Sequence, residues 1–257
     1  MTPILSVDKL SITFTRYSRG LSREEMPSVR ELSLTVEPGQ VAAVVGESGA
    51  GKSLLAHGIL HLLPRNAAMS GNILYDGMPL TADRARVLRG REIALIPQGV
   101  TYLDPMMRVG EQIRRGRGDE ASRARCRAVL SRYGLAAEVE GRYPFELSGG
   151  MARRVLIACA VMDNPRLIIA DEPTPGLDAR SAARILSHFR ELAEQGAGVL
   201  FITHDLELAC TVAHKIVVFR SGQTVEEAAS SAFQTGEGLT HPYSRALWRA
   251  LPKNDFL

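Results

Sequence analysis

The sequence predicts an α/β protein whose core is a parallel sheet. A continuous apolar segment, residues 41–45, has the character of a strand covered on both faces. A glycine-rich loop and a helix-like segment follow it directly. Further along the chain, short apolar segments alternate with amphipathic segments of helical length. Strands and helices that alternate at this spacing favour a parallel sheet with helices packed on it.

The N-terminal segment predicts a different kind of sheet. Apolar and polar residues alternate in residues 5–7, 10–14 and 32–36, which is the pattern of half-buried strands. We therefore expect an N-terminal antiparallel β subdomain. The polar residues 17–28 are predicted to form a loop between its last two strands.

The core elements follow in order. A helix is predicted over residues 53–63, and Pro64 is expected to end it because proline cannot continue the hydrogen-bonding pattern of a helix. Residues 103–142 are helix-like, polar and rich in arginine, which indicates an inserted α-helical subdomain at about residues 100–160. We expect further strands at residues 92–96, 167–170, 199–203 and 215–219, and further helices at residues 149–162, 179–194 and 206–213. The prediction is one domain over residues 1–257, with a C-terminal tail at residues 236–257.

Composition and charge exclude several classes of protein. The net charge of +3, from 31 basic and 28 acidic residues, is too small to indicate a nucleic-acid partner. The basic cluster at residues 114–127 is interpreted as a solvated surface, and the three cysteines as reduced packing residues. No apolar segment reaches the roughly 18 residues needed to cross a bilayer, and the N-terminus lacks the pattern of a secretion signal. We expect a cytoplasmic protein.

The glycine-rich loop has the pattern G-x-x-x-x-G-K-[ST], preceded by a buried strand and followed by a helix. Glycines let the backbone wrap phosphates closely, with amide hydrogens directed inward at the positive end of the helix. The lysine is expected to contact the β- and γ-phosphates of a nucleotide, and the final serine to ligate Mg²⁺. The loop consists of Gly46, Glu47, Ser48, Gly49, Ala50, Gly51, Lys52 and Ser53.

Two adjacent carboxylates, Asp171 and Glu172, end the apolar segment 167–170. The carboxyl ends of parallel strands open into the binding crevice of such sheets. We expect Asp171 to hold Mg²⁺ and Glu172 to polarise the attacking water. His57 and His61 lie four residues apart on the predicted helix but lack a third ligand, so they are expected to pack or face solvent rather than bind metal.

Together, these motifs resemble the nucleotide-binding subunits of ABC transporters, and the resemblance covers nearly the whole chain. It implies a P-loop NTPase core of the RecA-like type that hydrolyses ATP with Mg²⁺. Residues 147–151, Leu-Ser-Gly-Gly-Met, match the family signature, in which Ser148, Gly149 and Gly150 face the ATP held by an opposite subunit. The resemblance further implies roles for Gln98 (Mg²⁺ and attacking water), Asp178 (D-loop), His204 (γ-phosphate and water) and Phe14 (stacking on adenine), with Tyr17 an alternative to Phe14.

Two local sequences point to a branch of the family. Residues 143–151 and 241–247 are similar to the ATPases of oligopeptide, dipeptide and nickel importers, in which methionine often closes the signature. The short sequence after residue 247 is more like the nickel-type member. The expected function is therefore uptake of nickel or a metal chelate, with dipeptide or oligopeptide import as the alternative. An accessory ATPase of a phosphonate-degrading complex is a second alternative.

The resemblance also implies partners. These are a second, related ATPase subunit in a heterodimer, two membrane permease subunits and an extracytoplasmic solute-binding protein. The chain would then lie at the cytoplasmic face of the inner membrane as a peripheral subunit. Some positions depart from the subfamily: Gly99 follows Gln98 in place of an acidic residue, and residues 174–176 and 220–223 are irregular.

Overall fold

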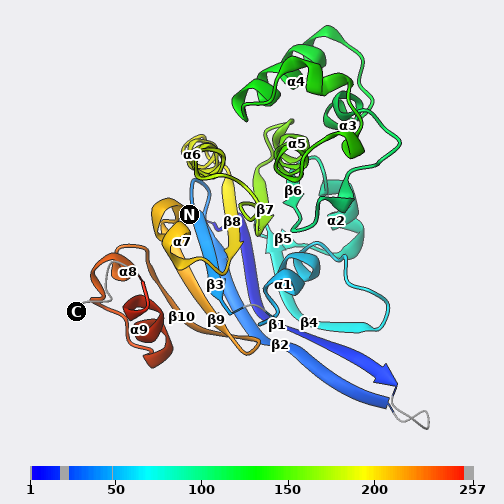
Figure 1. Cartoon of the computed structure of the whole chain (residues 1–257). Coiled ribbons are helices and arrows are strands. Elements are labelled where there is room, and N and C mark those ends of the chain that lie inside the picture. The colour runs from blue at the N-terminus through cyan, green and yellow to red at the C-terminus, as the bar shows by residue number, and fades with distance from the viewer. Residues whose placement is uncertain (1, 18–22, 48, 252–257) are drawn as a thin grey trace.

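The computed structural model describes residues 2–17, 23–47 and 49–251 of the chain. In this part of the chain, one sheet has the strand order β10-β9-β3-β8-β7-β6 and the other has the order β2-β1-β4-β5. The first sheet is parallel except for β10, which pairs antiparallel with β9. The second sheet is antiparallel throughout. The predicted α/β class is confirmed (Figure 1).

The elements have the following bounds. The strands are β1 (Leu5–Tyr17), β2 (Arg23–Val36), β3 (Val41–Gly46), β4 (Ala67–Tyr75), β5 (Met78–Pro79), β6 (Ile93–Ile96), β7 (Leu167–Asp171), β8 (Gly198–Thr203), β9 (Lys215–Arg220) and β10 (Gln223–Ala229). The α-helices are α1 (Lys52–Ile59), α2 (Ala82–Leu88), α3 (Val109–Arg114), α4 (Glu120–Arg132), α5 (Gly149–Val161), α6 (Ala179–Glu194), α7 (Leu206–Val212), α8 (Ala232–Thr235) and α9 (Pro242–Arg249).

The parallel sheet separates two hydrophobic cores. Successive side chains of a strand point to opposite faces, so Val44 belongs to one core and Val45 to the other. One core joins the sheet to α1 and the antiparallel sheet. The other joins it to α3, α4, α5, α6 and α7. Burial on both faces is the reason why these strands are continuously apolar in sequence.

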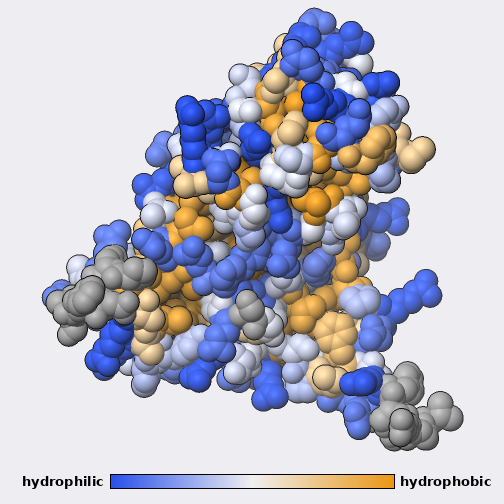
Figure 2. Space-filling model, in the orientation of Figure 1, coloured by the Kyte–Doolittle hydropathy of each residue, from blue (hydrophilic) through white to orange (hydrophobic). Residues whose placement is uncertain are grey.

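The prediction of a loop over residues 17–28 was wrong at residues 17 and 23–28, which belong to strands, while residues 18–22 lie outside the described part of the chain. Strand β1 continues to Tyr17 and β2 begins at Arg23, and the two strands pair through Phe14 with Met26 and Thr15 with Glu25. Main-chain hydrogen bonds hold this ribbon together, so its side chains can remain polar where the ribbon extends away from the body (Figure 1). Figure 2 shows hydrophilic side chains along the outer part of this ribbon and over α4.

The first helix ends earlier than predicted, at Ile59 rather than at residue 63. His61 adopts a left-handed conformation with φ of 51°, and the N–H of Leu62 donates to the carbonyl oxygen of His57 at 2.8 Å. This hydrogen-bond pattern closes the C-terminus of a helix, and it ends α1 before Pro64.

Several elements were absent from the sequence prediction, namely β4, β5, α2, β10, α8 and α9. Strand β4 has exposed polar residues in its middle, and the two-residue strand β5 pairs with only its last two residues on the side away from β1, so the hydrophobic pattern of β4 is weak. The segment between β6 and β7 in sequence is confirmed as helical, and within it α3 and α4 pack on α5. Its treatment as a separate subdomain at residues 100–160 stays a prediction.

The basic cluster at residues 114–127 is only partly solvated. Asp163 lies within 4.0 Å of the guanidinium groups of Arg115, Arg117 and Arg125, and Arg114 pairs with Glu140. The contacts with Asp163 tie α4 and the segment before it to the end of α5, and the pair with Glu140 ties α3 to residues 137–141. The three cysteines are free thiols. Among the residues that the structure describes, no helix combines the length and apolar character needed to cross a bilayer.

Candidate active site

The glycine-rich loop connects β3, whose six residues are all buried, to the N-terminus of α1. A Cβ atom at Gly46 would lie 2.0 Å from the carbonyl oxygen of Phe219 on the neighbouring strand β9, so only glycine fits there. Gly51 has φ of +98°, which other residues rarely adopt. The loop therefore turns tightly onto α1, where the first backbone N–H groups of the helix are available to an anion.

Lys52 lies inside the curve of this loop and is 6% exposed. Its ammonium group donates to the carbonyl oxygens of Gly46 at 2.7 Å and Glu47 at 2.8 Å. Burial lowers the pKa of Lys52, while the carboxylates of Glu172, Asp171 and Glu47 oppose this shift. The predicted loop residues Gly49, Ala50 and Gly51 complete the turn, and Ser48 falls outside the described residues.

Asp171 ends β7 opposite the start of α1. Burial raises the pKa of its carboxyl group, and a hydrogen bond from the Ser53 hydroxyl opposes the shift. The Oδ1 atom of Asp171 is buried and accepts no hydrogen bond from any described residue. A hydroxyl and a carboxylate with a free oxygen are the hard donors that Mg²⁺ prefers. Asp171 and Ser53 thus fit a Mg²⁺ ion beside Lys52.

Glu172 follows Asp171 with φ of 47°, a left-handed conformation that is rare for a residue with a side chain. Its N–H still donates to the carbonyl oxygen of Ile202 on β8 at 2.9 Å. One carboxylate oxygen, Oε1, lies 2.8 Å from Nδ1 of His204, and the other, Oε2, is buried without a partner in the described part of the chain. Such backbone strain concentrates at functional sites, where it fixes the direction of a side chain.

Gln98 completes the cavity at the glycine-rich loop. It follows β6 and Pro97, and lines a space of about 280 Å³ together with Glu172 and residues of the loop and α1. The structure therefore brings Gln98, Glu172, Lys52 and Ser53 to one cavity, and places Asp171 and His204 in hydrogen-bond contact with two of them.

Arg153 on α5 is a charged residue beside this cavity that was not predicted from the sequence. Its side chain is 8% exposed, and Nη1 donates to the carbonyl oxygen of Pro97, the residue before Gln98, at 3.1 Å. Burial lowers the pKa of Arg153, and the carboxylates of Asp171 and Glu172 oppose this shift. No sequence signal separates Arg153 from its neighbour Arg154 in the segment after the signature.

Replacement of Arg153 by methionine is expected to lower the turnover number for ATP about tenfold while the KM for ATP changes less than threefold. The variant keeps the aliphatic stem but leaves the Pro97 carbonyl oxygen without a donor, and a hydrogen bond from a charged donor contributes roughly 1.5–3 kcal/mol. Steady-state ATPase kinetics measure both parameters. Arg123→Met, on the exposed side of α4, is the matched control. We expect the contact of Arg153 with Pro97 to position the next residue, Gln98, and an Arg153→Met protein with the control's turnover would contradict this role.

The signature residues do not line the cavity of their own chain. Ser148 begins α5, where its Oγ atom accepts a hydrogen bond from the N–H of Met151 at 3.3 Å. Ser148 and Gly149 are exposed, and a Cβ atom at Gly149 would meet nothing within 4 Å. A Cβ atom at Gly150 would lie 3.5 Å from the carbonyl oxygen of Gly176. This surface is accessible to a second subunit.

Two other predicted residues also lie outside the cavity. Phe14 is half-buried on β1 and packs against the core of the antiparallel sheet. The Asp178 carboxylate accepts hydrogen bonds from the N–H of Ser181 at 2.9 Å and from its hydroxyl at 2.7 Å, which begins α6. The side chain of Tyr17 is outside the described part of the chain. Contacts of Phe14 or Tyr17 with adenine, and of Asp178 with a nucleotide, stay predictions.

His57 and His61 do not converge. The ring of His57 bonds through Nδ1 to the carbonyl oxygen of Ser53 at 2.9 Å, and that of His61 through Nε2 to the carbonyl oxygen of Leu80 at 2.6 Å. Within the described ranges, no group of three or more His, Cys, Asp or Glu side chains is placed to hold a metal ion.

Comparisons with known proteins agree with this geometry. A sequence model of the family described as "ABC transporter" matches residues 29–175. The chain is 36% identical to a putative peptide import ATP-binding protein of Brucella melitensis, over 98% of this chain and 78% of that protein. It is 38% identical to the dipeptide transport ATP-binding protein DppD of Escherichia coli, over 97% of this chain and 79% of that protein.

A solved structure shows the same fold. The dimeric structure of MJ0796, a bacterial ABC transporter cassette, superposes with a TM-score of 0.76 and 26% sequence identity. The match covers 88% of this chain and 98% of that one. The same cassette is also known in a dimeric post-hydrolysis state with ADP and Pi. The chain belongs to the ABC transporter family, as one of its ATP-hydrolysing nucleotide-binding cassettes.

Proposed function

We propose that this chain is the ATPase subunit of an importer of dipeptides or oligopeptides. The observation that carries the proposal is its similarity, at 35–38% identity over 97–98% of the chain, to proteins named for peptide import, oligopeptide transport and dipeptide transport. These names favour the alternative from the sequence over nickel, which the sequence placed first. The phosphonate complex stays the second alternative.

Within that function, the loop amides and Lys52 bind the phosphates of ATP. Lys52 is available because its present acceptors are two backbone carbonyl oxygens, from which the flexible side chain can turn to the β- and γ-phosphates. Asp171, Ser53 and Gln98 would hold Mg²⁺. When bound, the ion neutralises charge that develops on the phosphates.

Glu172 and His204 act on the attacking water. The Glu172 carboxylate is held by the Nδ1–H of His204 at one oxygen, which leaves Oε2 free to accept a proton from the water. Gln98 lines the same cavity and orients the water from the segment that follows β6. The ring of His204 is 54% exposed, so its other nitrogen can reach the γ-phosphate.

The proposed catalytic unit contains two cassettes. Ser148 and Gly149 are exposed and Gly150 is half-buried at the N-terminus of α5, away from the cavity of their own chain. Backbone N–H groups at a helix N-terminus attract anions, so the signature suits the γ-phosphate held by another subunit. We propose a related ATPase as that subunit, together with two permeases and an extracytoplasmic solute-binding protein. The complex would place this chain at the cytoplasmic face of the inner membrane.

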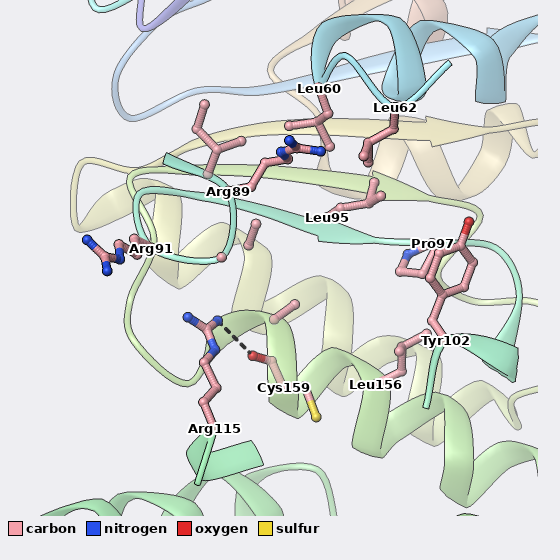
Figure 3. Close-up of a pocket in the computed structure, with 14 residues that line it drawn as sticks. Leu60, Leu62, Arg89, Arg91, Leu95, Pro97, Tyr102, Arg115, Leu156 and Cys159 are labelled. Carbon is pink, nitrogen blue, oxygen red and sulfur yellow. Dashed lines mark hydrogen bonds between the residues drawn. The ribbon is translucent and has the colours of Figure 1, made fainter. Parts of the chain in front are cut away.

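A second cavity suits the permease. It encloses about 510 Å³ between the end of α1, β6 and α5 (Figure 3), and Pro97 places it directly beside Gln98. Its lining is mostly apolar, with Leu62, Leu95 and Leu156 among the contributors, while the guanidinium groups of Arg91 and Arg115 lie at one side. An amphipathic segment of the permease with an acidic residue matches this combination.

The variant Leu62→Asp tests this assignment. A charge within the apolar lining is expected to weaken binding to detergent-solubilised permeases more than tenfold, because the carboxylate loses solvent there. Binding of ATP should stay within twofold of the unmodified chain. Val87→Asp is the matched control, since Val87 is an exposed aliphatic residue on α2 outside the cavity. Equal permease affinity for the two variants would exclude this cavity as the docking surface.

Transport in cells tests the proposed cargo. Cells that lack the gene should fail to use dipeptides or oligopeptides as a source of a required amino acid. The intact gene should restore growth, and Glu172→Gln should not. Uptake of radioactive nickel and growth on phosphonates are measured in the same cells. Normal peptide use with loss of nickel uptake, or with loss of growth on phosphonates, would replace the peptide proposal with the corresponding alternative.

A further inference from the structure

The C-terminal segment, residues 236–251, packs against β10 and the core of the parallel sheet. Glu226 on β10 accepts hydrogen bonds from the N–H groups of Thr240 and His241 and from the Thr240 hydroxyl, at 2.6–3.2 Å. The Trp248 ring covers Gly236, where a Cβ atom would lie 2.6 Å from the ring. Leu251 is buried in the same core as the parallel sheet. Helix α9 is thus fixed in place next to β9 and β10.

From this position, α9 reaches the glycine-rich loop. The Tyr243 hydroxyl donates to Oε1 of Glu47 at 3.1 Å, across 196 residues of sequence. The guanidinium group of Arg220, at the end of β9, lies 4.5 Å from the centre of the Tyr243 ring. Burial, with the hydrogen bond to Glu47, raises the pKa of Tyr243, so the hydroxyl stays protonated as a donor. Neighbouring Phe219 on β9 is the residue whose carbonyl oxygen packs against Gly46.

The contact matters because Glu47 is an unfavourable residue at this place. Its carboxylate carries the same charge as the phosphates that the loop binds, and like charges at short range repel. A donor that draws the carboxylate toward α9 reduces this repulsion. The cation of Arg220 over the same tyrosine adds a favourable field.

The hydrogen bond from Tyr243 can also support the glycine-rich loop when the loop loses its hydrogen bonds from Lys52. Lys52 binds the carbonyl oxygens of Gly46 and Glu47 in the present structure. When Lys52 turns to the phosphates, the loop loses these two hydrogen bonds. The hydrogen bond from Tyr243 does not involve Lys52, so it can hold Glu47 both before and after the nucleotide enters.

We propose that Tyr243 of helix α9 is a positioning residue for ATP, which acts through the carboxylate of Glu47 to hold the phosphate loop open to the nucleotide. The proposal makes the C-terminal helix a part of the nucleotide site. It depends on ATP binding by the family and not on the identity of the cargo, so failure of the peptide proposal would leave it intact.

A double-mutant cycle on the full chain tests the proposal. Tyr243→Phe keeps the ring on Arg220 and removes only the hydroxyl. We expect it to weaken equilibrium binding of Mg-ATP three- to tenfold when Glu47 is present. In a Glu47→Ala chain, the same substitution should change the affinity less than 1.5-fold, because its acceptor is gone. In the transporter complex, the KM for ATP should rise by the same factor as the dissociation constant, with the turnover number within twofold of the unmodified value.

Two controls separate positioning from a general loss of structure. Trp248, the only tryptophan of the chain, lies on α9, so an unchanged emission spectrum of Tyr243→Phe shows that the helix stays in place. Arg249→Gln, at an exposed position of the same helix, should bind Mg-ATP like the unmodified chain. An affinity change below 1.5-fold in the presence of Glu47, or an equal change with and without Glu47, would overturn the proposal.

Discussion

Glu172→Gln is expected to bind ATP with an affinity within threefold of the unmodified chain and to hydrolyse it about 10²- to 10⁴-fold more slowly. Glutamine keeps the size of the side chain but cannot accept a proton from water, and general-base assistance contributes a factor of this order. The substitution removes the basic character of Oε2. This atom is buried and has no partner among the described residues. Equilibrium binding and steady-state hydrolysis measure the two effects on the same preparation.

His204→Ala is the companion variant to Glu172→Gln. It removes the donor at 2.8 Å from Oε1 while the carboxylate remains, and its turnover should therefore fall less if Glu172 is the base. Turnover of Glu172→Gln within threefold of the unmodified chain would remove Glu172 from the mechanism. An effect of His204→Ala larger than that of Glu172→Gln would transfer the main catalytic role to the histidine.

The second large effect is expected at the signature. Ser148→Arg should leave ATP binding to the chain's own loop within twofold, because Ser148 does not line that cavity. Turnover by the assembled pair should fall at least 100-fold at the site that the signature completes, since the larger side chain occupies the space in front of α5. Nucleotide binding by the isolated chain and turnover by the pair are measured separately.

An arginine added elsewhere on the helical region serves as the control for this variant. Glu138→Arg makes such a change at an exposed position outside the signature, and should leave both quantities unchanged. If Ser148→Arg kept full turnover, Ser148 would not face a nucleotide. If it lost ATP binding to its own loop, the signature would act within one chain, contrary to the proposed arrangement.

Much of the core fold follows from hydrophobic pattern. The parallel strands are buried on both faces, and such strands are recognisable as apolar runs, as for β3 with its six buried residues. The hydrophobic pattern did not predict strands that carry polar side chains and are held by main-chain pairing. The outer part of the β1 and β2 ribbon and strand β4 are of this kind. Hydrophobic periodicity carries no signal for such strands, because few of their side chains are buried.

Some residues of the candidate site could likewise be predicted from the sequence, and others could not. Residues that adjoin one another in sequence, such as those of the glycine-rich loop, carry a local pattern that predicts their role. Arg153 and Tyr243 could not be found in this way. Their partners, Pro97 and Glu47, lie 56 and 196 residues away, and only the fold brings the two members of each pair together. Sequence alone shows an arginine on a helix and a tyrosine in a tail.

The proposed catalytic site is shared between two chains. The direct test measures ATP turnover per chain over a dilution series, with the association state followed in parallel by sedimentation. We expect turnover to follow the dimeric fraction, whether the second cassette is a copy of this chain or a related ATPase. The monomeric chain should bind ATP and hydrolyse it at less than about 1% of the dimer's rate, a factor that the missing electrostatic contacts to the γ-phosphate can supply. Full turnover by a monodisperse monomer would contradict a catalytic site shared between two chains.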